Sequence, residues 1–193
     1  MNPDTGQTPD PIATHADRAA PELAALVELF YERLGNLGGF TELQEQVLPE
    51  PYRTLLAHDA HMTVTVEAHH NSKVDVDVLE THRTDTHYSR KILLRRQSDG
   101  VVVQFGLVRL NVAFLGADAR REIESEQTPL GRVLIEHDVL RHVRLLSLWE
   151  TQPSAELCDL FGLQQPQPCY GRTALIYCNG MPAVELLEIV TPT

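Results

Sequence analysis

The feature that most restricts the fold of this chain is a strong β-hairpin signal near its C-terminal end. Asn179-Gly180 stands between two largely apolar runs, residues 172–178 and residues 182–190. Asn-Gly is favoured in two-residue hairpin turns, because both central residues of a type I′ turn need positive φ. Such a turn joins neighbouring antiparallel strands. The sequence therefore predicts an antiparallel sheet that ends in this hairpin.

Other segments upstream have strand character. Apolar and polar side chains alternate from Met62 to Ala68 and again from Val74, which is the pattern of half-buried strands. Ser98-Asp99-Gly100 marks a second hairpin turn, in which glycine supplies the positive φ. The predicted strands before the closing hairpin are residues 62–68, 74–79, 88–96, 101–114 and 139–149.

Helical spacing separates these strands. Pro21 suits the first turn of a helix, Thr41 suits a cap, and Thr128-Pro129 has the form of a helix start with threonine as cap. The predicted helices are residues 21–34, 41–47, a short piece after Pro51, 116–126, 128–136 and 153–161. Hairpins dominate over parallel crossover units. The predicted fold class is α+β, a single domain with an antiparallel sheet of about six strands flanked by helices.

The N-terminal segment differs in composition from the rest. Residues 1–19 are rich in Pro, Thr and Asp, which predicts a disordered tail ahead of a domain over residues 20–193. The start lacks the charged and apolar regions of a secretory signal. No apolar stretch reaches the ~18 residues that a spanning helix needs. We therefore expect a soluble, cytoplasmic protein.

Charge restricts the class of partner. The formal net charge is −11, which argues against nucleic acid and against an anionic membrane surface as partners. It does not argue against a small anionic substrate, because one or two buried arginines can bind a carboxylate inside an acidic protein.

Cysteine and histidine give little support for a metal site. The three cysteines show no CxxC spacing, so reduced thiols are expected. His58, Asp59 and His61 lie together, but the nine histidines form no recognised ligand motif. We expect no metal and no cofactor, and interpret His58 and His61 as residues that order a loop beside a pocket.

Three segments carry a resemblance to a known family. They are LLAHDAHMT at 55–63, Ser89-Arg90-Lys91-Ile92-Leu93-Leu94, and the stretch that runs from NVAFLGADARREIESEQTPLGRVL into the closing hairpin. Their order and spacing resemble the chorismate lyase family from about Leu55 to Pro192. Thr-Pro-Leu-Gly-Arg at 128–132 is the most specific piece. Each motif alone is weak, and the ordered set carries the resemblance.

The resemblance implies a closed internal pocket for an aryl acid. By this resemblance Arg90 binds the ring carboxylate, and Glu188 meets the ring hydroxyl or transfers a proton. Backbone groups at Met62, Leu130 and Gly131 complete the substrate-binding site. A planar guanidinium suits this task, because it offers a carboxylate two parallel hydrogen bonds. Arg172 is a further candidate, either for the enolpyruvyl carboxylate or as a surface residue.

The sequence departs from the family in two places. The interval from Pro182 to Glu188 is one residue longer than in the family, which makes Glu185 a competing candidate for the pocket carboxylate. The interval from Leu55 to Met62 is also one residue longer. These departures leave the local geometry open.

The implied activity is a lyase that converts chorismate to 4-hydroxybenzoate and pyruvate without a cofactor. Aromatisation of the ring drives this elimination, so the protein need only orient the substrate and stabilise charge. One alternative is a non-catalytic aryl-acid-binding domain of the same fold, as in the sensor domains of some transcription regulators. Only about 50 residues precede the match, which disfavours a regulator with its own DNA-binding domain. A second alternative is a divergent lyase that gives another hydroxybenzoate.

Overall fold

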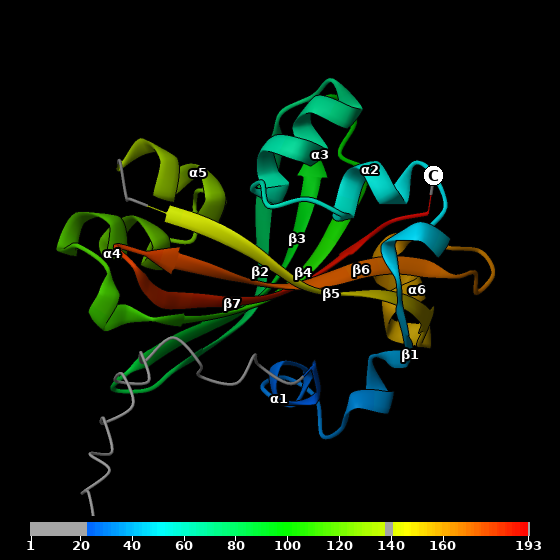
Figure 1. The fold of residues 1–193 in the computed structure, drawn as a ribbon, viewed down its shortest axis with the longest axis horizontal. Coiled ribbons are helices and arrows are strands. Elements are labelled where there is room, and N and C mark those ends of the chain that lie inside the picture. The colour runs from blue at the N-terminus through cyan, green and yellow to red at the C-terminus, as the bar shows by residue number, and fades with distance from the viewer. Residues whose placement is uncertain (1–22, 138–140, 193) are drawn as a thin grey trace, which may run out of the picture.

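Seven strands form one antiparallel sheet in the order β1-β5-β6-β7-β4-β3-β2 (Figure 1). The computed structural model describes residues 23–137 and 141–192. The strands are β1 (Gly38–Leu43), β2 (Val74–Arg83), β3 (His87–Arg96), β4 (Val102–Asn111), β5 (Arg141–Pro153), β6 (Cys169–Cys178) and β7 (Met181–Val190). The prediction of a single-domain α+β fold with a sheet of about six strands is confirmed, and the described residues form seven.

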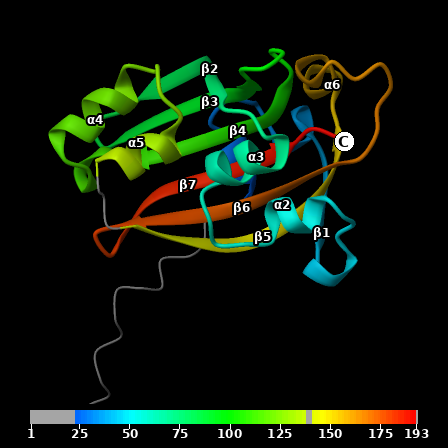
Figure 2. The same cartoon turned by 90° about the horizontal axis from the view of Figure 1, so that it is seen from above.

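Helices cover both faces of the sheet (Figures 1 and 2). The helices α1 (Leu23–Val27) and α6 (Ala155–Phe161) pack on one face, in a core with Phe105, Leu187 and Ile189. The opposite face carries α2 (Tyr52–Leu56), α3 (Met62–His70), α4 (Ala117–Glu124) and α5 (Leu130–Glu136). Short 3-10 turns lie at Leu34–Asn36, Glu45–Val47 and Val112–Phe114. Two apolar clusters fill this second face, one under α2 and α3 and one under α4 and α5.

The closing hairpin forms where the Asn-Gly signal predicts it. Asn179 has φ 52° and Gly180 has φ 80°, and β6 pairs with β7 on either side of them. The second predicted turn is also present, with Gly100 at φ 73° between β3 and β4. The closing hairpin matters for function, because β7 occupies the middle of the sheet between β4 and β6.

The predicted strand from Met62 to Ala68 is wrong, because this segment forms α3. Met62 and Val66 are buried one helical turn apart, whereas Val64 is 49% exposed. A strand would bury Val64 together with its alternate neighbours, so the burial has the period of a helix. Asn71 ends the helix in the left-handed conformation, at φ 46°.

The N-terminal predictions are also corrected. The predicted helix at 41–47 is wrong, because β1 pairs Thr41 with Glu150 of β5 and only Glu45–Val47 makes a helical turn. Of the helix predicted at 21–34, the described part is Leu23–Val27, and the chain leaves the helix after Val27. Its first residues and the expected tail over 1–19 lie outside the described residues. The start of the strand predicted from Val139 does so as well.

The remaining elements occur close to their predicted positions. Ser154 caps α6, with its hydroxyl accepting a hydrogen bond from Leu157 N at 3.2 Å. At α5 the cap position is taken by Pro129 and not by Thr128, so the helix begins at Leu130. None of the described helices is long and apolar enough to cross a membrane.

Candidate ligand-binding site

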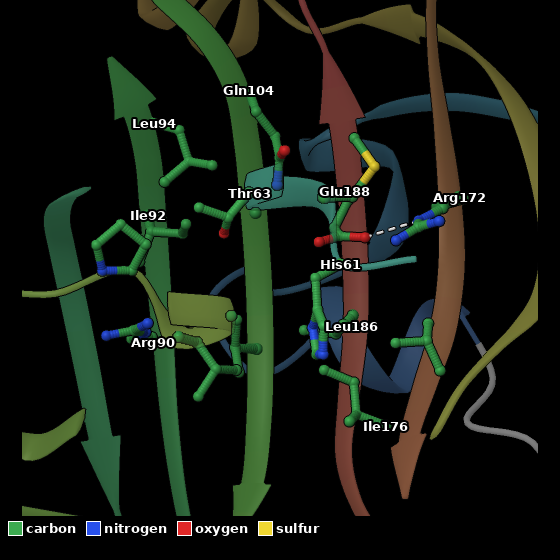
Figure 3. A pocket seen from close by; sticks show the side chains of 17 residues that line it. His61, Thr63, Arg90, Ile92, Leu94, Gln104, Arg172, Ile176, Leu186 and Glu188 are labelled. Atoms are coloured by element: carbon green, nitrogen blue, oxygen red, sulfur yellow. Dashed lines mark hydrogen bonds and ion pairs between the residues drawn. The ribbon is translucent and has the colours of Figure 1, made fainter. Parts of the chain in front are cut away.

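A cavity lies between the sheet and the first residues of α3 and α5 (Figure 3). It encloses about 490 Å³ of space, including its mouth. Its lining is His61, Met62, Thr63, Arg90, Ile92, Leu94, Gln104, Gly106, Val108, Pro129, Leu130, Gly131, Val143, Arg172, Ile176, Leu186 and Glu188.

Strand register arranges the floor of the cavity in rows. Side chains two residues apart on a strand share a face, and paired residues lie side by side. One row crosses four strands, from Ile92 of β3 through Gly106 and Glu188 to Arg172 of β6. The next row on one side holds Arg90 with Val108 and Leu186. The row on the other side holds Leu94 with Gln104 and Val190.

Two helix starts form the roof. Met62 is the first residue of α3, and Leu130 and Gly131 are the first two of α5. The first N–H groups of a helix have no acceptor within the helix, so they are free to bind other groups. Gly131 allows the close approach of the two starts, because a Cβ there would lie 3.0 Å from Thr63 Oγ1 and 3.4 Å from His61 Cβ.

Arg90 is buried in the cavity with an incompletely paired guanidinium. The residue is 1% exposed, and its Nε and Nη1 have no hydrogen-bond partner among the described residues. Burial lowers the pKa of Arg90, an effect that nearby Tyr88 and Glu126 oppose. An arginine nevertheless stays charged in proteins. A buried cation with unpaired donors is costly unless an anion meets it.

Glu188 and Arg172 form a buried ion pair at the other side of the cavity. Arg172 Nε donates to Glu188 Oε2 at 2.8 Å, and the side chains are 1% and 9% exposed respectively. In Figure 3 the other carboxylate oxygen of Glu188 points away from Arg172. Glu185 faces the opposite side of β7, where it pairs with Arg109. Of the two competing carboxylates, Glu188 is therefore the one in the cavity.

The rest of the Arg172 guanidinium holds the connector between α2 and α3. Nη1 donates to the carbonyl oxygens of Leu56 at 3.4 Å and His58 at 2.8 Å, and Nη2 donates to that of Ala60 at 3.0 Å. These bonds tie the connector to the sheet beside the start of α3. Arg172 thus links the roof of the cavity to its floor.

His58 completes this network as a neutral ring. Its Nδ1 lies 3.2 Å from Arg172 Nη1 and 3.1 Å from the N–H of Ala60, and its Nε2 lies 2.7 Å from Leu55 O. Two donors at Nδ1 and an acceptor at Nε2 require the tautomer protonated on Nε2. Burial, followed by the charge of Arg172, lowers the pKa of His58. These bonds support the interpretation that His58 orders the loop, and His61, which was named with it, lines the cavity.

The six predicted site residues come together in this cavity. Its lining includes all six, namely Met62, Arg90, Leu130, Gly131, Arg172 and Glu188. Their roles in binding or catalysis stay predictions. Among residues 23–137 and 141–192, no group of three or more His, Cys, Asp or Glu side chains is arranged to hold a metal ion.

Sequence reasoning missed Gln104, which also lines the cavity. It is 2% exposed, and its Oε1 has no hydrogen-bond partner within the described parts of the chain. A signal was present, because Gln104 is the one amide in the run Val-Val-Gln-Phe-Gly-Leu-Val. A polar residue inside a strand that is buried on both faces needs a partner.

Comparison with known proteins supports the fold. No protein-family model and no curated protein sequence matches the chain. The effector domain of PhnF from Mycobacterium smegmatis matches with a TM-score of 0.51 and 12% identity, over 68% of this chain and 88% of that one. A structure of PhnF from the same organism matches with a TM-score of 0.50 and 12% identity, over 68% of this chain and 64% of that one. The chain therefore spans less than two thirds of the longer PhnF structure.

A more distant match is the ligand-binding domain of a putative GntR-family transcriptional regulator from Bordetella bronchiseptica. Its TM-score is 0.44 at 14% identity, over 61% of this chain and 85% of that domain. At these identities the likeness to the PhnF structures concerns the fold alone. The fold is a chorismate lyase-like fold, which the effector domain of PhnF shares.

Proposed function

We propose that the cavity binds a small aryl carboxylate, with Arg90 as the carboxylate receptor. One observation carries the proposal, namely the buried guanidinium with Nε and Nη1 unpaired among the described residues. A carboxylate binds a guanidinium along the edge of Nε and Nη2 or the edge of Nη1 and Nη2, and each of these edges includes one of the two unpaired donors. A charge-assisted hydrogen bond from either donor to a carboxylate oxygen would compensate the buried cation.

The walls of the cavity suit an aromatic ring. Apolar side chains surround the floor, namely those of Ile92, Leu94, Val108, Ile176 and Leu186. Gly106 leaves the floor without a side chain between Ile92 and Glu188. A Cβ at this position would lie only 3.1 Å from Ile92 Cγ1. Met62 and Leu130, the first residues of α3 and α5, complete the lining from the roof. A flat apolar body with one anionic end satisfies these surfaces together.

A second candidate function is elimination of pyruvate from chorismate, which the buried Glu188 favours. In this reaction the carbon that bears the hydroxyl loses its hydrogen as a proton. The bond from the ring to the enolpyruvyl oxygen breaks, the ring becomes aromatic, and the enolpyruvate takes up a proton to give pyruvate. Atoms and electrons balance without an oxidant. In this scheme Arg90 holds the ring carboxylate, and Glu188 binds the hydroxyl or moves the proton.

We assign Arg172 to positioning in both schemes. Its guanidinium already donates to Glu188, Leu56, His58 and Ala60. Contact with an enolpyruvyl carboxylate stays a prediction from the sequence, and would require Arg172 to give up part of this network. A positioning role explains why such a large cation is fully buried without facing a ligand.

The test separates binding from turnover. Calorimetric titration with benzoate and 4-hydroxybenzoate measures binding, and incubation with chorismate measures release of pyruvate and of an aromatic product. We expect both acids to bind to the wild type and not to Arg90→Met. Arg120→Met is the matched control, because it removes an exposed arginine from α4. Equal benzoate affinity in Arg90→Met and the wild type would refute the carboxylate role.

Incubation with chorismate distinguishes an enzyme from a ligand-sensing domain. Stoichiometric pyruvate and 4-hydroxybenzoate from the wild type, lost in Glu188→Gln, would support the lyase. Binding of 4-hydroxybenzoate with no turnover of chorismate would support a ligand-sensing domain. The neighbouring PhnF structure is an effector domain, and the Bordetella bronchiseptica structure is a ligand-binding domain.

A further inference from the structure

Gln104 also lines the cavity, and its Oε1 has no hydrogen-bond partner among the residues that the structure describes. Four side-chain atoms of the described residues are buried without a hydrogen bond, namely Arg90 Nε, Arg90 Nη1, Gln104 Oε1 and Thr151 Oγ1. The first three belong to residues that line the cavity, whereas Thr151 lies outside it. An unsatisfied buried acceptor costs stability in the empty protein. Its clustering with Arg90 in one cavity therefore points to a ligand.

The register places Gln104 at the opposite end of the cavity floor from Arg90. Leu94 pairs with Gln104 and Arg90 pairs with Val108, so the two polar residues are separated by two rows of the sheet. At about 3.4 Å per residue this offset is roughly 14 Å along the strands. In Figure 3 Arg90 and Gln104 are drawn apart, on the neighbouring strands β3 and β4. A ligand held by Arg90 at its carboxylate thus extends toward Gln104 with its other end.

The end of the cavity at Gln104 is rich in acceptors. Gln104 pairs with Val190, two residues from Glu188 on the same face of β7. The positive charge of Arg172 is already directed at the Glu188 carboxylate and at main-chain carbonyls. A second anionic group would meet repulsion from Glu188 here. A group that carries hydrogen-bond donors would be accepted by both side chains.

We propose that Gln104 is the specificity-determining residue of this cavity, selecting aryl carboxylates that carry a hydroxyl or amino donor remote from the carboxylate. The proposal rests on the proposed function, because Arg90 sets the orientation of the ligand. The Oε1 atom of Gln104 accepts a hydrogen bond from the donor group. Ligands that present an apolar group or an ether there leave this acceptor unsatisfied and bind more weakly.

The experiment compares ligands that differ only at the ring position opposite the carboxylate. Dissociation constants are measured by calorimetry for benzoate, 4-methoxybenzoate, 4-hydroxybenzoate and 4-aminobenzoate. For the wild type we expect the hydroxyl and amino compounds to bind about tenfold more tightly than the methoxy compound. In Gln104→Met and Gln104→Leu we expect this preference, taken as the ratio of the dissociation constants within each variant, to fall to about twofold or less.

Thr151→Val is the matched control. It also removes an unpartnered buried polar atom, but one outside the cavity. We expect all three variants to unfold at a temperature equal to or above that of the wild type, and only the Gln104 variants to lose the donor preference. A purely structural role for Gln104 would instead lower the unfolding temperature and leave the preference intact.

The two proposals fail in distinguishable ways. One result would overturn the role of Gln104 but not that of Arg90. In it, benzoate binding depends on Arg90, and the Gln104 variants keep the same preference for ligands with a donor group. Retention of the preference would then assign it to Glu188 alone. No binding of any of the four acids to the wild type would overturn the carboxylate site, and the role of Gln104 with it.

Discussion

Arg172 Nε donates to Glu188 Oε2 at 2.8 Å between paired positions of β6 and β7, and both side chains are almost fully buried. The same guanidinium holds the carbonyl groups of the connector between α2 and α3. A buried ion pair is stable only where further hydrogen bonds satisfy its remaining groups. Here the loop carbonyls do this for Arg172. Through Arg172, the connector at the roof of the cavity is therefore bonded to the carboxylate of Glu188 on its floor.

Arg172→Met should lower the free energy of unfolding by about 3–5 kcal/mol, because it leaves Glu188 as an unpaired buried charge. The measurement is urea denaturation. Adding Glu188→Leu to this variant should recover part of the loss, since the uncompensated charge is then gone. The double-mutant cycle gives the coupling of the two residues. A loss below about 1 kcal/mol in the single variant would show that the pair does not stabilise the fold.

Arg90→Met should have the opposite effect on stability. The substitution removes a buried cation with two unpaired donors and puts an apolar side chain of comparable length in its place. We expect the free energy of unfolding to rise by about 1–3 kcal/mol while binding of aryl carboxylates is lost. Arg95→Met serves as control, because Arg95 is 40% exposed at the side chain and pairs with Asp77 at the surface. A marked loss of stability in Arg90→Met would contradict the assignment of Arg90 to a ligand.

Strand parity made much of the cavity floor predictable. Arg90, Ile92 and Leu94 share a face by simple alternation, and Glu185 and Glu188 fall on opposite faces because they are three residues apart. The alternation of side chains along a strand does not show which face of the sheet carries the cavity. That depends on the central place of β7 between β4 and β6, which no local pattern contains.

The roof was less predictable than the floor. Met62 to Ala68 alternates like a strand and is rich in β-branched residues, yet tertiary packing makes it a helix. The bonds from Arg172 to the connector join residues 112 to 116 positions apart, so no short-range pattern reports them. The local signal that was available is Asn71, a residue type that ends helices in the left-handed conformation.

Stability should fall on mild acidification because of His58. Burial and Arg172 lower its pKa in the folded state, while Glu188 and Asp59 oppose this effect. The unfolded chain therefore binds more protons than the folded protein once the pH falls below about 6.5. The free energy of unfolding should decrease from that pH downward and level off below the folded pKa of His58. Urea denaturation between pH 7.5 and pH 5 measures this slope.

The control for the acid effect is His58→Gln, which should reduce the slope. It should not abolish it, because burial also lowers the pKa of His70. An unchanged slope in His58→Gln would assign the acid sensitivity to other groups and would remove His58 from the network around Arg172.

Gly171→Ala should destabilise the protein, because the backbone of β7 leaves no room at this position. A Cβ on Gly171 would lie 2.6 Å from the carbonyl oxygen of Glu188 and 3.0 Å from Ile189 Cγ1. The first contact is with main chain in a central strand, so relief requires β6 and β7 to move apart beside the Arg172–Glu188 pair. We expect a loss of about 1–3 kcal/mol in the free energy of unfolding. Gly39→Ala is the matched control in the same sheet, since its Cβ would meet only Gln152 Cβ, at 3.8 Å. Equal stability of the two variants would show that the sheet adapts at Gly171, and that the spacing of β6 and β7 is not what holds the pair in place.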